Sequence, residues 1–279
     1  SFHSLTYTPV LRATGASKVD SNKLRALTRE WPRDKAAMYG TAACKLVGLA
    51  RQEGVGCLAD DTDAFWLALI ERHEIEPDSE EGTQGGMIAA ASELLAASNG
   101  SKLVDFDDLL HWAVLRNVPL PRFDLIMVDE AQDTNAIQRA ILRKIMAAGS
   151  RIVAVGDPAQ AIYGFRGADS DSMARIAREF NCSPLPLTVT YRCDKAIVAY
   201  ASQWAHLEAA PQADEGIVEQ AGEKWATSEF GADDLIVCRT NAPLIGLAYR
   251  LMRERIPCHV MGDRKSTRLN SSHTDISRM

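Results

Sequence analysis

The stretch FDLIMVDEAQDTNAIQRAILRKIMAAGSRIVAVGD, residues 123–157, decides the fold. Between Phe123 and Val128 it carries a short apolar run bounded by polar residues, which is typical of a strand buried on both faces. Apolar residues then recur three and four apart from Ile137 to Ile145, which predicts a helix that stops at Gly149. A second apolar run covers Ile152 to Val155. Strand, helix and strand within about 30 residues predict a parallel βαβ unit.

Polar residues follow both predicted strands. Asp129 and Glu130 come directly after the first strand, and Gly156 and Asp157 come after the second. Parallel strands end at the same edge of a sheet, where open α/β folds bind ligands, so these residues should face one crevice. Adjacent carboxylates suit nucleotide hydrolysis, in which one holds Mg²⁺ and the other orients or deprotonates the attacking water. An acidic pair is also common at helix N-termini, where it complements the dipole, so the pair alone leaves both interpretations open.

Helical and strand-like segments flank this unit. Apolar residues three and four apart predict a helical region between Asp34 and Asn117, broken by an acidic, glycine-containing segment at residues 76–82. Its helices are Ala37–Leu49, Ala64–Ile70, Met87–Ala97 and Phe106–Leu115. A second α/β unit is expected to begin near Leu187. Its predicted elements are strands at Leu185–Thr190, Asp234–Cys238 and Cys258–Met261, with a helix at Pro243–Arg255.

Composition narrows the class of protein. The chain has 31 Lys and Arg against 37 Asp and Glu, a net charge of −6, so any nucleic-acid binding must come from a local groove. The six cysteines form no CxxC pair and no zinc-ligand spacing, which favours reduced thiols in the cytoplasm. No apolar run approaches the roughly 18 residues of a membrane span, and the first residues do not resemble a signal peptide.

Three longer strings resemble motifs II, III and IV of superfamily 1A helicases, the UvrD/Rep/PcrA group. They are VDEAQDTN at 128–135, VGDPAQAIYGFRGA at 155–168 and LTVTYR at 187–192, in the family's order and spacing. Shorter matches resemble motif Ib, the helix before motif II, and motif IVa. These are Ser1–Leu5, Asp105–Leu110 and Cys238–Ala242. The resemblance spans roughly residues 1–263, with 45–100 matched only by position, and it favours the catalytic interpretation of the acidic pair.

The resemblance implies an α/β chain with two motor domains. Residues 1–44 and 101–186 would form part of a first RecA-like, parallel-sheet motor domain, and residues 45–100 a helical insertion. Residues 187–263 would begin a second RecA-like domain. Residues 264–279 are polar and aperiodic, and we expect an artefactual tail there, with a genuine disordered tail as the alternative.

The resemblance also implies roles at an ATP site. Asp129 would bind Mg²⁺, Glu130 would act as the catalytic base, and Gln160 would sense the γ-phosphate. From the second motor domain, Arg192 would act as an arginine finger and Tyr191 would stack on the adenine. A guanidinium in that role accelerates related phosphoryl transfers by about 10³ to 10⁵.

DNA contacts are implied in the same way. Tyr163 and Phe165 would stack on the bases of single-stranded DNA, which is independent of sequence. His3, Arg239 and Asn241 would contact the DNA backbone and position the strand. The expected partners are single-stranded DNA and duplex–single-strand junctions.

The sequence contains no GxxxxGK[ST] loop, which would hold the β and γ phosphates of ATP, and motifs V and VI do not follow Gly262. We therefore expect part of an ATP-dependent, 3′–5′ DNA helicase or translocase of repair, replication or recombination that is inactive by itself. Two alternatives remain. One is a non-catalytic remnant that binds single-stranded DNA, and the other is the motor part of a RecB/AddA-type helicase–nuclease.

Overall fold

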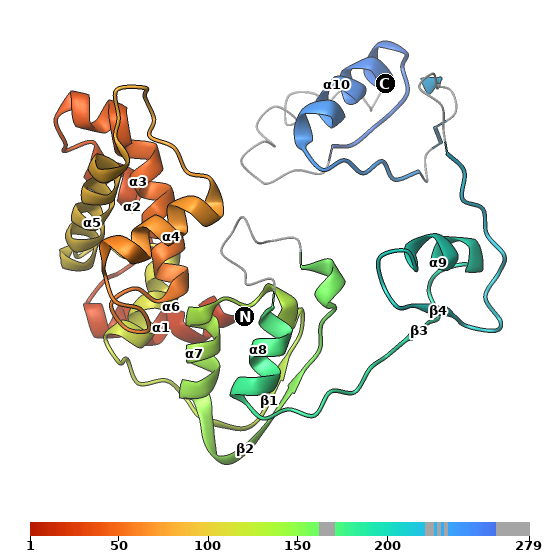
Figure 1. Ribbon diagram of the computed structural model, residues 1–279, viewed down its shortest axis with the longest axis horizontal. Helices are drawn as coiled ribbons and strands as arrows, with labels where there is room; N and C mark the ends of the chain where they lie inside the picture. The colour runs from red at the N-terminus through yellow and green to blue at the C-terminus, as the bar shows by residue number, and fades with distance from the viewer. Residues whose placement is uncertain (162–170, 221–225, 228–229, 232–233, 261–279) are drawn as a thin grey trace. The chain divides into compact units, whose positions relative to one another are not determined.

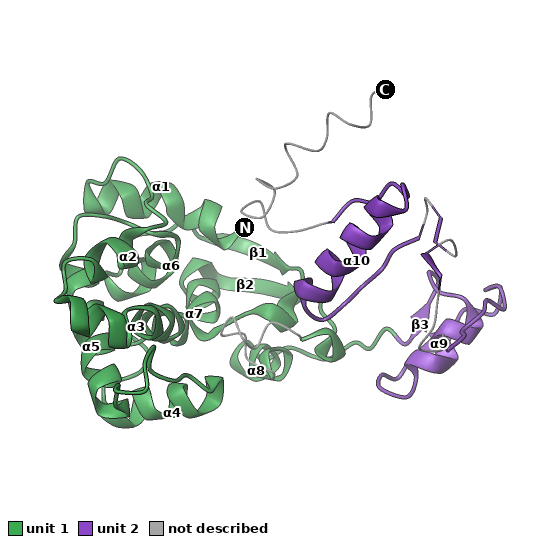
Figure 2. Ribbon diagram, turned by 90° about the horizontal axis from the view of Figure 1, so that it is seen from above, with its two compact units in different colours: residues 1–187 green, residues 188–279 purple. Residues whose placement is uncertain are grey.

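The computed structural model describes residues 1–161, 171–220, 226–227, 230–231 and 234–260. The chain divides into two compact units, Ser1–Leu187 and Thr188–Met279 (Figure 2). The elements of the first unit (Figure 1) are α1 Phe2–Thr14, α2 Lys23–Thr28, α3 Arg33–Glu53, α4 Asp63–His73, α5 Gln84–Gly100, α6 Phe106–Leu115, β1 Phe123–Val128, η1 Ala131–Asp133, α7 Ala136–Ile145, β2 Met146–Ala154, η2 Pro158–Gln160 and α8 Ser172–Glu179. Those of the second unit are β3 Val189–Thr190, α9 Lys195–Ala201, β4 Glu208–Ala209 and α10 Asn241–Arg253. None of the described helices is long and apolar enough to cross a membrane.

The four helices predicted between residues 34 and 117 are confirmed as α3 to α6. Helices α3, α4 and α5 enclose a core around the buried side chains of Leu46, Trp66 and Leu94. Helix α3 is capped by Gly54, which has a left-handed φ of +79° and whose N–H donates to carbonyls of the last turn. The helix runs unbroken from Arg33 to Glu53, across the boundary expected at residue 44. Periodicity did not predict α1 and α2.

The predicted βαβ unit is confirmed. Strands β1 and β2 pair in parallel, with Ile126 opposite Ile152 and Val128 opposite Ala154, and α7 connects them. Helix α7 begins with a capping box, in which Asn135 and Gln138 exchange side-chain bonds to each other's backbone N–H. The prediction that this helix stops at Gly149 is wrong, because it ends at Ile145. Gly149, at φ +76°, instead lies where the pairing of β2 with β1 is irregular.

The prediction that the first strand is buried on both faces is also wrong. Ile126 and Val128 are buried against side chains of α7 and α8, whereas Leu125 is 50% exposed and Met127 is 74% exposed. Successive side chains of a strand point to opposite faces. One face of the two-stranded sheet is therefore packed, and the other is exposed in the described part of the chain.

The second unit contains less sheet than predicted. Only Val189–Thr190 of the expected strand 185–190 is a strand, and it pairs in parallel with Glu208–Ala209. Residues 234–238 and 258–260 form no strand, and Leu235 and Val237 are 78% and 80% exposed. A strand needs a partner to satisfy its backbone, and these segments have none among the described residues. The helix predicted at 243–255 is confirmed as α10, two residues earlier at each end.

A buried cluster of charges joins α2, α3 and α6. Lys23 Nζ lies 2.6 Å from Asp108 Oδ2, and Arg51 lies 2.8 Å from Asp105 Oδ2 and 3.3 Å from Asp108 Oδ1. Burial lowers the pKa of Lys23 and raises that of Asp108, because desolvation penalises both charged forms, while the opposite charges beside each group counteract the shift. The Lys23 ammonium also lies 4.3 Å from the centre of the Trp112 ring, a cation–π contact that stabilises its charge.

Asp107 lies beside this cluster, and its ionisation should make the stability of the chain depend on pH. Burial, and then the negative charge of Asp105, raise the pKa of Asp107 from 3.8 to about 6. Because the folded-state pKa is raised, the stability contributed by this group is present below pH 3.8 and is lost as the pH rises through about 6. We expect Asp107→Asn to stabilise the chain by about 1 to 3 kcal/mol at pH 8, and by about half of that at pH 5.

Urea unfolding of both proteins at the two pH values measures this difference. Asp60→Asn, at an exposed position, serves as the control and should leave the stability almost unchanged at either pH. An equal gain for Asp107→Asn at pH 5 and pH 8 would show that the carboxyl group does not titrate as described.

Candidate nucleotide-binding site

The loops after β1 and β2 are held together at one edge of the sheet. The Val155 N–H donates to the Val128 carbonyl at 2.8 Å, and the Ala131 N–H donates to the Val155 carbonyl at 2.9 Å. These bonds continue the ladder beyond the last paired residues of the strands. The acidic pair after β1 and the polar turn after β2 therefore lie next to each other, as the parallel pairing predicts.

Glu130 has an unusual backbone conformation. Its φ of 50° and ψ of 44° lie in the left-handed region, and its N–H donates to Asp129 Oδ1 at 3.0 Å. The chain therefore turns sharply directly after the strand and enters η1. Both carboxylates are exposed to solvent, where a ligand can reach them.

Gln132 connects the two loops. Its side-chain Nε2 donates to Glu130 Oε2 at 2.7 Å, and its Oε1 accepts from the Asp157 N–H at 3.1 Å. The residue is only 3% exposed. Gly156 allows this approach, because a Cβ at that position would lie 2.4 Å from Gln132 Oε1. One buried amide thus fixes the orientation of the Glu130 carboxylate and ties it to the turn after β2.

The turn after β2 places Gln160. Asp157 Oδ1 accepts from the Ala159 N–H at 2.9 Å, and Gln160 Nε2 donates to Asp157 Oδ2 at 2.8 Å. Gln160 ends the short helix η2 and is exposed. A continuous series of hydrogen bonds therefore joins the acidic pair to Gln160 through Gln132 and Asp157.

A second set of hydrogen bonds joins α8 to the segment that follows the acidic pair. The Thr134 carbonyl accepts hydrogen bonds from Ser172 Oγ at the start of α8 and from Arg139 Nη1 at 3.5 Å. All three residues are buried. Neither Ser172 nor Arg139 was predicted from the sequence, because Ser172 lies 38 residues from Thr134 and both side chains bond to a backbone carbonyl, which leaves no motif in the sequence. Together they hold α8 against the segment that follows the acidic pair.

The other predicted site residues are distributed over the chain. His3 lies on α1, with its ring 6.1 Å from the Phe106 ring, and burial lowers the pKa of His3, which favours the neutral imidazole at pH 7. Four predicted site residues that follow β3 belong to the second unit, and all four are exposed. They are Tyr191, Arg192, Arg239 and Asn241. Tyr163 and Phe165, and the tail 264–279, lie outside the described residues.

The carboxylates at the strand ends fit a magnesium ion only in combination with a nucleotide. Within the described residues, no group of three or more His, Cys, Asp or Glu side chains is arranged to hold a metal. Mg²⁺ commonly takes one or two protein carboxylates and completes its shell with water and phosphate oxygens. Asp129 and Glu130, both exposed at the strand end, can supply such a carboxylate.

The bridging role of Gln132 was not predicted from the sequence. Replacing this residue tests the hydrogen-bond network. Gln132→Leu should destabilise the chain by about 1 to 3 kcal/mol, because it leaves the partly buried Asp157 N–H without its acceptor. Urea unfolding measures this change. Gln160→Leu is the matched control, since this exposed amide also bonds to Asp157, and it should change stability by less than about 0.5 kcal/mol. Equal effects of the two substitutions would contradict a bridging role for Gln132.

Comparison with known proteins identifies the class. Residues 63–181 match the UvrD/REP helicase N-terminal domain. The chain is 36% identical to DNA helicase II of Escherichia coli over 115 residues, which cover 38% of this chain and 16% of that protein. It is 35% identical to a probable DNA helicase II homologue of Mycoplasma genitalium over 155 residues, 51% of this chain and 22% of that protein. Over 77 residues, 28% of this chain and 7% of its relative, it is 38% identical to the RecBCD enzyme subunit RecB of Mycobacterium tuberculosis.

These matches indicate the helicase class over part of the chain. Residues 63–181 are similar to the UvrD-like helicases of superfamily 1. The chain spans less than a quarter of the length of the curated relatives that it matches.

Proposed function

We propose that this chain forms part of the motor of an ATP-dependent DNA helicase or translocase that moves 3′ to 5′ on single-stranded DNA in the cytoplasm. In this proposal, residues 1–44 and 101–186 belong to a first RecA-like domain and residues 45–100 to a helical insertion. Residues 187–263 begin a second RecA-like domain. The parallel pairing of β1 and β2 and the family match support the first of these assignments.

The proposed ATP site uses the crevice at the strand ends. Asp129 holds Mg²⁺, Glu130 accepts a proton from the attacking water, and Gln160 contacts the γ-phosphate. When bound, Mg²⁺ neutralises charge on the phosphate oxygens. From the second unit, Arg192 supplies a positive charge to the γ-phosphate and Tyr191 stacks on the adenine.

The observation that carries this proposal is the bridge made by Gln132. It holds the Glu130 carboxylate 2.7 Å from an amide donor and joins it, through Asp157, to Gln160. The buried Gln132 side chain thus links the exposed carboxylate of Glu130 to the exposed amide of Gln160. Such a link suits a site in which the state of the bound nucleotide must be transmitted beyond the groups that react.

The test is ATP turnover by a longer form of the protein that includes a phosphate-binding loop. We expect turnover that requires Mg²⁺ and rises when single-stranded DNA is added, and none from the 279-residue chain alone. A longer protein that binds DNA and does not hydrolyse ATP would establish the non-catalytic alternative instead.

DNA contacts are proposed for residues of each unit. His3, Arg239 and Asn241 contact the backbone, while Tyr163 and Phe165 stack on bases, and junctions between duplex and single strand load the motor. We expect Phe165→Ala to weaken binding of a fluorescent oligo-dT strand to this chain by about 5- to 100-fold, since stacking on an aromatic contributes about 1 to 3 kcal/mol per base. Fluorescence anisotropy measures the affinity. Phe123→Ala, a part-exposed ring at the start of β1, is the control and should leave the affinity unchanged.

The similarity to RecB favours a second candidate, the motor part of a helicase–nuclease. Incubating the longer protein with linear duplex DNA, Mg²⁺ and ATP distinguishes the two. Unwound but intact strands indicate a stand-alone helicase, and degraded strands indicate the helicase–nuclease.

A further inference from the structure

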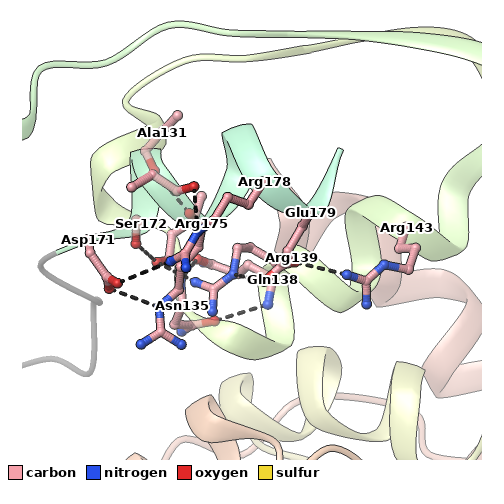
Figure 3. Close-up of polar contacts among 12 residues, drawn as sticks. Ala131, Asn135, Gln138, Arg139, Arg143, Asp171, Ser172, Arg175, Arg178 and Glu179 are labelled. Carbon is pink, nitrogen blue, oxygen red and sulfur yellow. Dashed lines mark hydrogen bonds and ion pairs between the residues drawn. The ribbon is translucent and has the colours of Figure 1, made fainter. Parts of the chain in front are cut away.

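Helices α7 and α8 carry a concentration of positive charge in a chain with a net charge of −6. Arg139 and Arg143 extend from α7, and Arg175 and Arg178 extend from α8 (Figure 3). The two acidic residues drawn with them are Asp171 and Glu179. Four guanidinium groups thus meet two carboxylates on neighbouring helices.

Each carboxylate is shared by two arginines. Glu179 lies 3.2 Å from Arg139 Nε and 3.0 Å from Arg143 Nη2. The Arg175 hydrogen bond lowers the pKa of Asp171, which keeps this carboxylate ionised at neutral pH. Asp171 lies 2.8 Å from Arg175 Nε and 3.7 Å from Arg178 Nη2. Each set therefore contains two guanidinium groups for one carboxylate.

The outer three arginines are accessible and held in place. The side chains of Arg143, Arg175 and Arg178 are 58%, 42% and 73% exposed, whereas that of Arg139 is 4% exposed. An open hollow is lined by Arg175 and Arg178 together with the two carboxylates. An arginine already held by a carboxylate loses less freedom when it also binds an anion, and its planar fork matches a phosphate.

We propose that this arginine face, Arg143, Arg175 and Arg178, binds the phosphates of a nucleic-acid strand outside the nucleotide crevice. The positive groups are spread over two helices, which suits a ligand with repeated negative charges better than a single small anion. The inference rests on the proposed function, because it assigns this face to the same DNA strand. A purely structural role, in which the ion pairs only join α7 to α8, would leave DNA affinity unchanged.

The experiment measures binding of the 279-residue chain to fluorescent oligo-dT by anisotropy at several salt concentrations. The double variant Arg175→Gln/Arg178→Gln should lower the affinity about tenfold at low salt and reduce the slope of log affinity against log salt by about 1, since each phosphate contact on a single strand contributes about 0.7. Arg175→Lys/Arg178→Lys should retain the slope, because it keeps both charges. Arg250→Gln/Arg253→Gln, with the same spacing on α10, is the matched control and should change neither quantity.

Thermal unfolding followed by circular dichroism accompanies each variant, and we expect little change because exposed ion pairs contribute little to stability. An unchanged slope in the Arg175/Arg178 glutamine variant overturns the inference. If Phe165→Ala weakens binding and the glutamine variant does not, the proposed stacking stands and only the arginine face is rejected. The opposite pattern supports the arginine face and rejects the stacking. No binding by the unaltered chain overturns both.

Discussion

Changing Glu130 to Gln, in a longer form of the protein with a phosphate-binding loop, should reduce DNA-stimulated ATP turnover by about 10² to 10⁴-fold and leave ATP binding in place. The amide has almost the same shape as the carboxylate and can still accept the bond from Gln132 Nε2. It cannot accept a proton from water. Steady-state turnover and equilibrium binding of a fluorescent ATP analogue, measured on the same preparation, separate the two effects.

Asp124→Asn is the control for this substitution. Asp124 is an exposed carboxylate near the start of β1, whereas Glu130 follows the end of that strand. Its replacement should leave turnover within about twofold, because a surface charge away from the crevice has little influence on the reaction. Turnover by Glu130→Gln equal to that of the unaltered protein would remove Glu130 from the role of base.

Replacing Arg51 by Met should destabilise the 279-residue chain by about 3 to 5 kcal/mol. Arg51 is 1% exposed and contacts Asp105 and Asp108, so its loss leaves two carboxylates buried with less compensation. Such a loss is a large fraction of the 5 to 15 kcal/mol, roughly, that stabilises a typical protein. Equilibrium urea unfolding, followed by circular dichroism, gives the change in free energy.

The same substitution at Arg72 provides the comparison. Arg72 lies 2.7 Å from Glu53, a similar distance, but its side chain is 56% exposed. Arg72→Met should therefore change stability by at most about 1 kcal/mol. If the two methionine variants were equally stable, the buried cluster would contribute no more than an ion pair at the surface.

The βαβ unit could be predicted because its signals are local. Apolar runs mark both strands, and residues three and four apart mark α7. Which faces are covered depends instead on distant segments, so the exposure of Leu125 and Met127 could not be predicted from the run itself. The same reason explains residues 234–238, where alternating apolar residues suggest a strand but do not reveal whether a partner strand lies beside them.

The position of the candidate site was predictable from the ends of parallel strands, and Asp129, Glu130 and Asp157 do lie at one edge. The bridge through Gln132 was not, because it depends on the close approach that Gly156 allows. Nor was the buried cluster, since Lys23 and Asp108 are 85 residues apart and each resembles an ordinary surface charge in the sequence. The catalytic and DNA-binding roles of the residues remain predictions.

The left-handed turn at Glu130 has a consequence for how variants of this protein would be selected. A non-glycine residue in that conformation is disfavoured by about 1 to 2 kcal/mol, so glycine would suit the backbone better. A screen for thermal resistance alone should therefore enrich Glu130→Gly, at the expense of the proposed chemistry. The carboxylate occupies a position that folding by itself would assign to another amino acid.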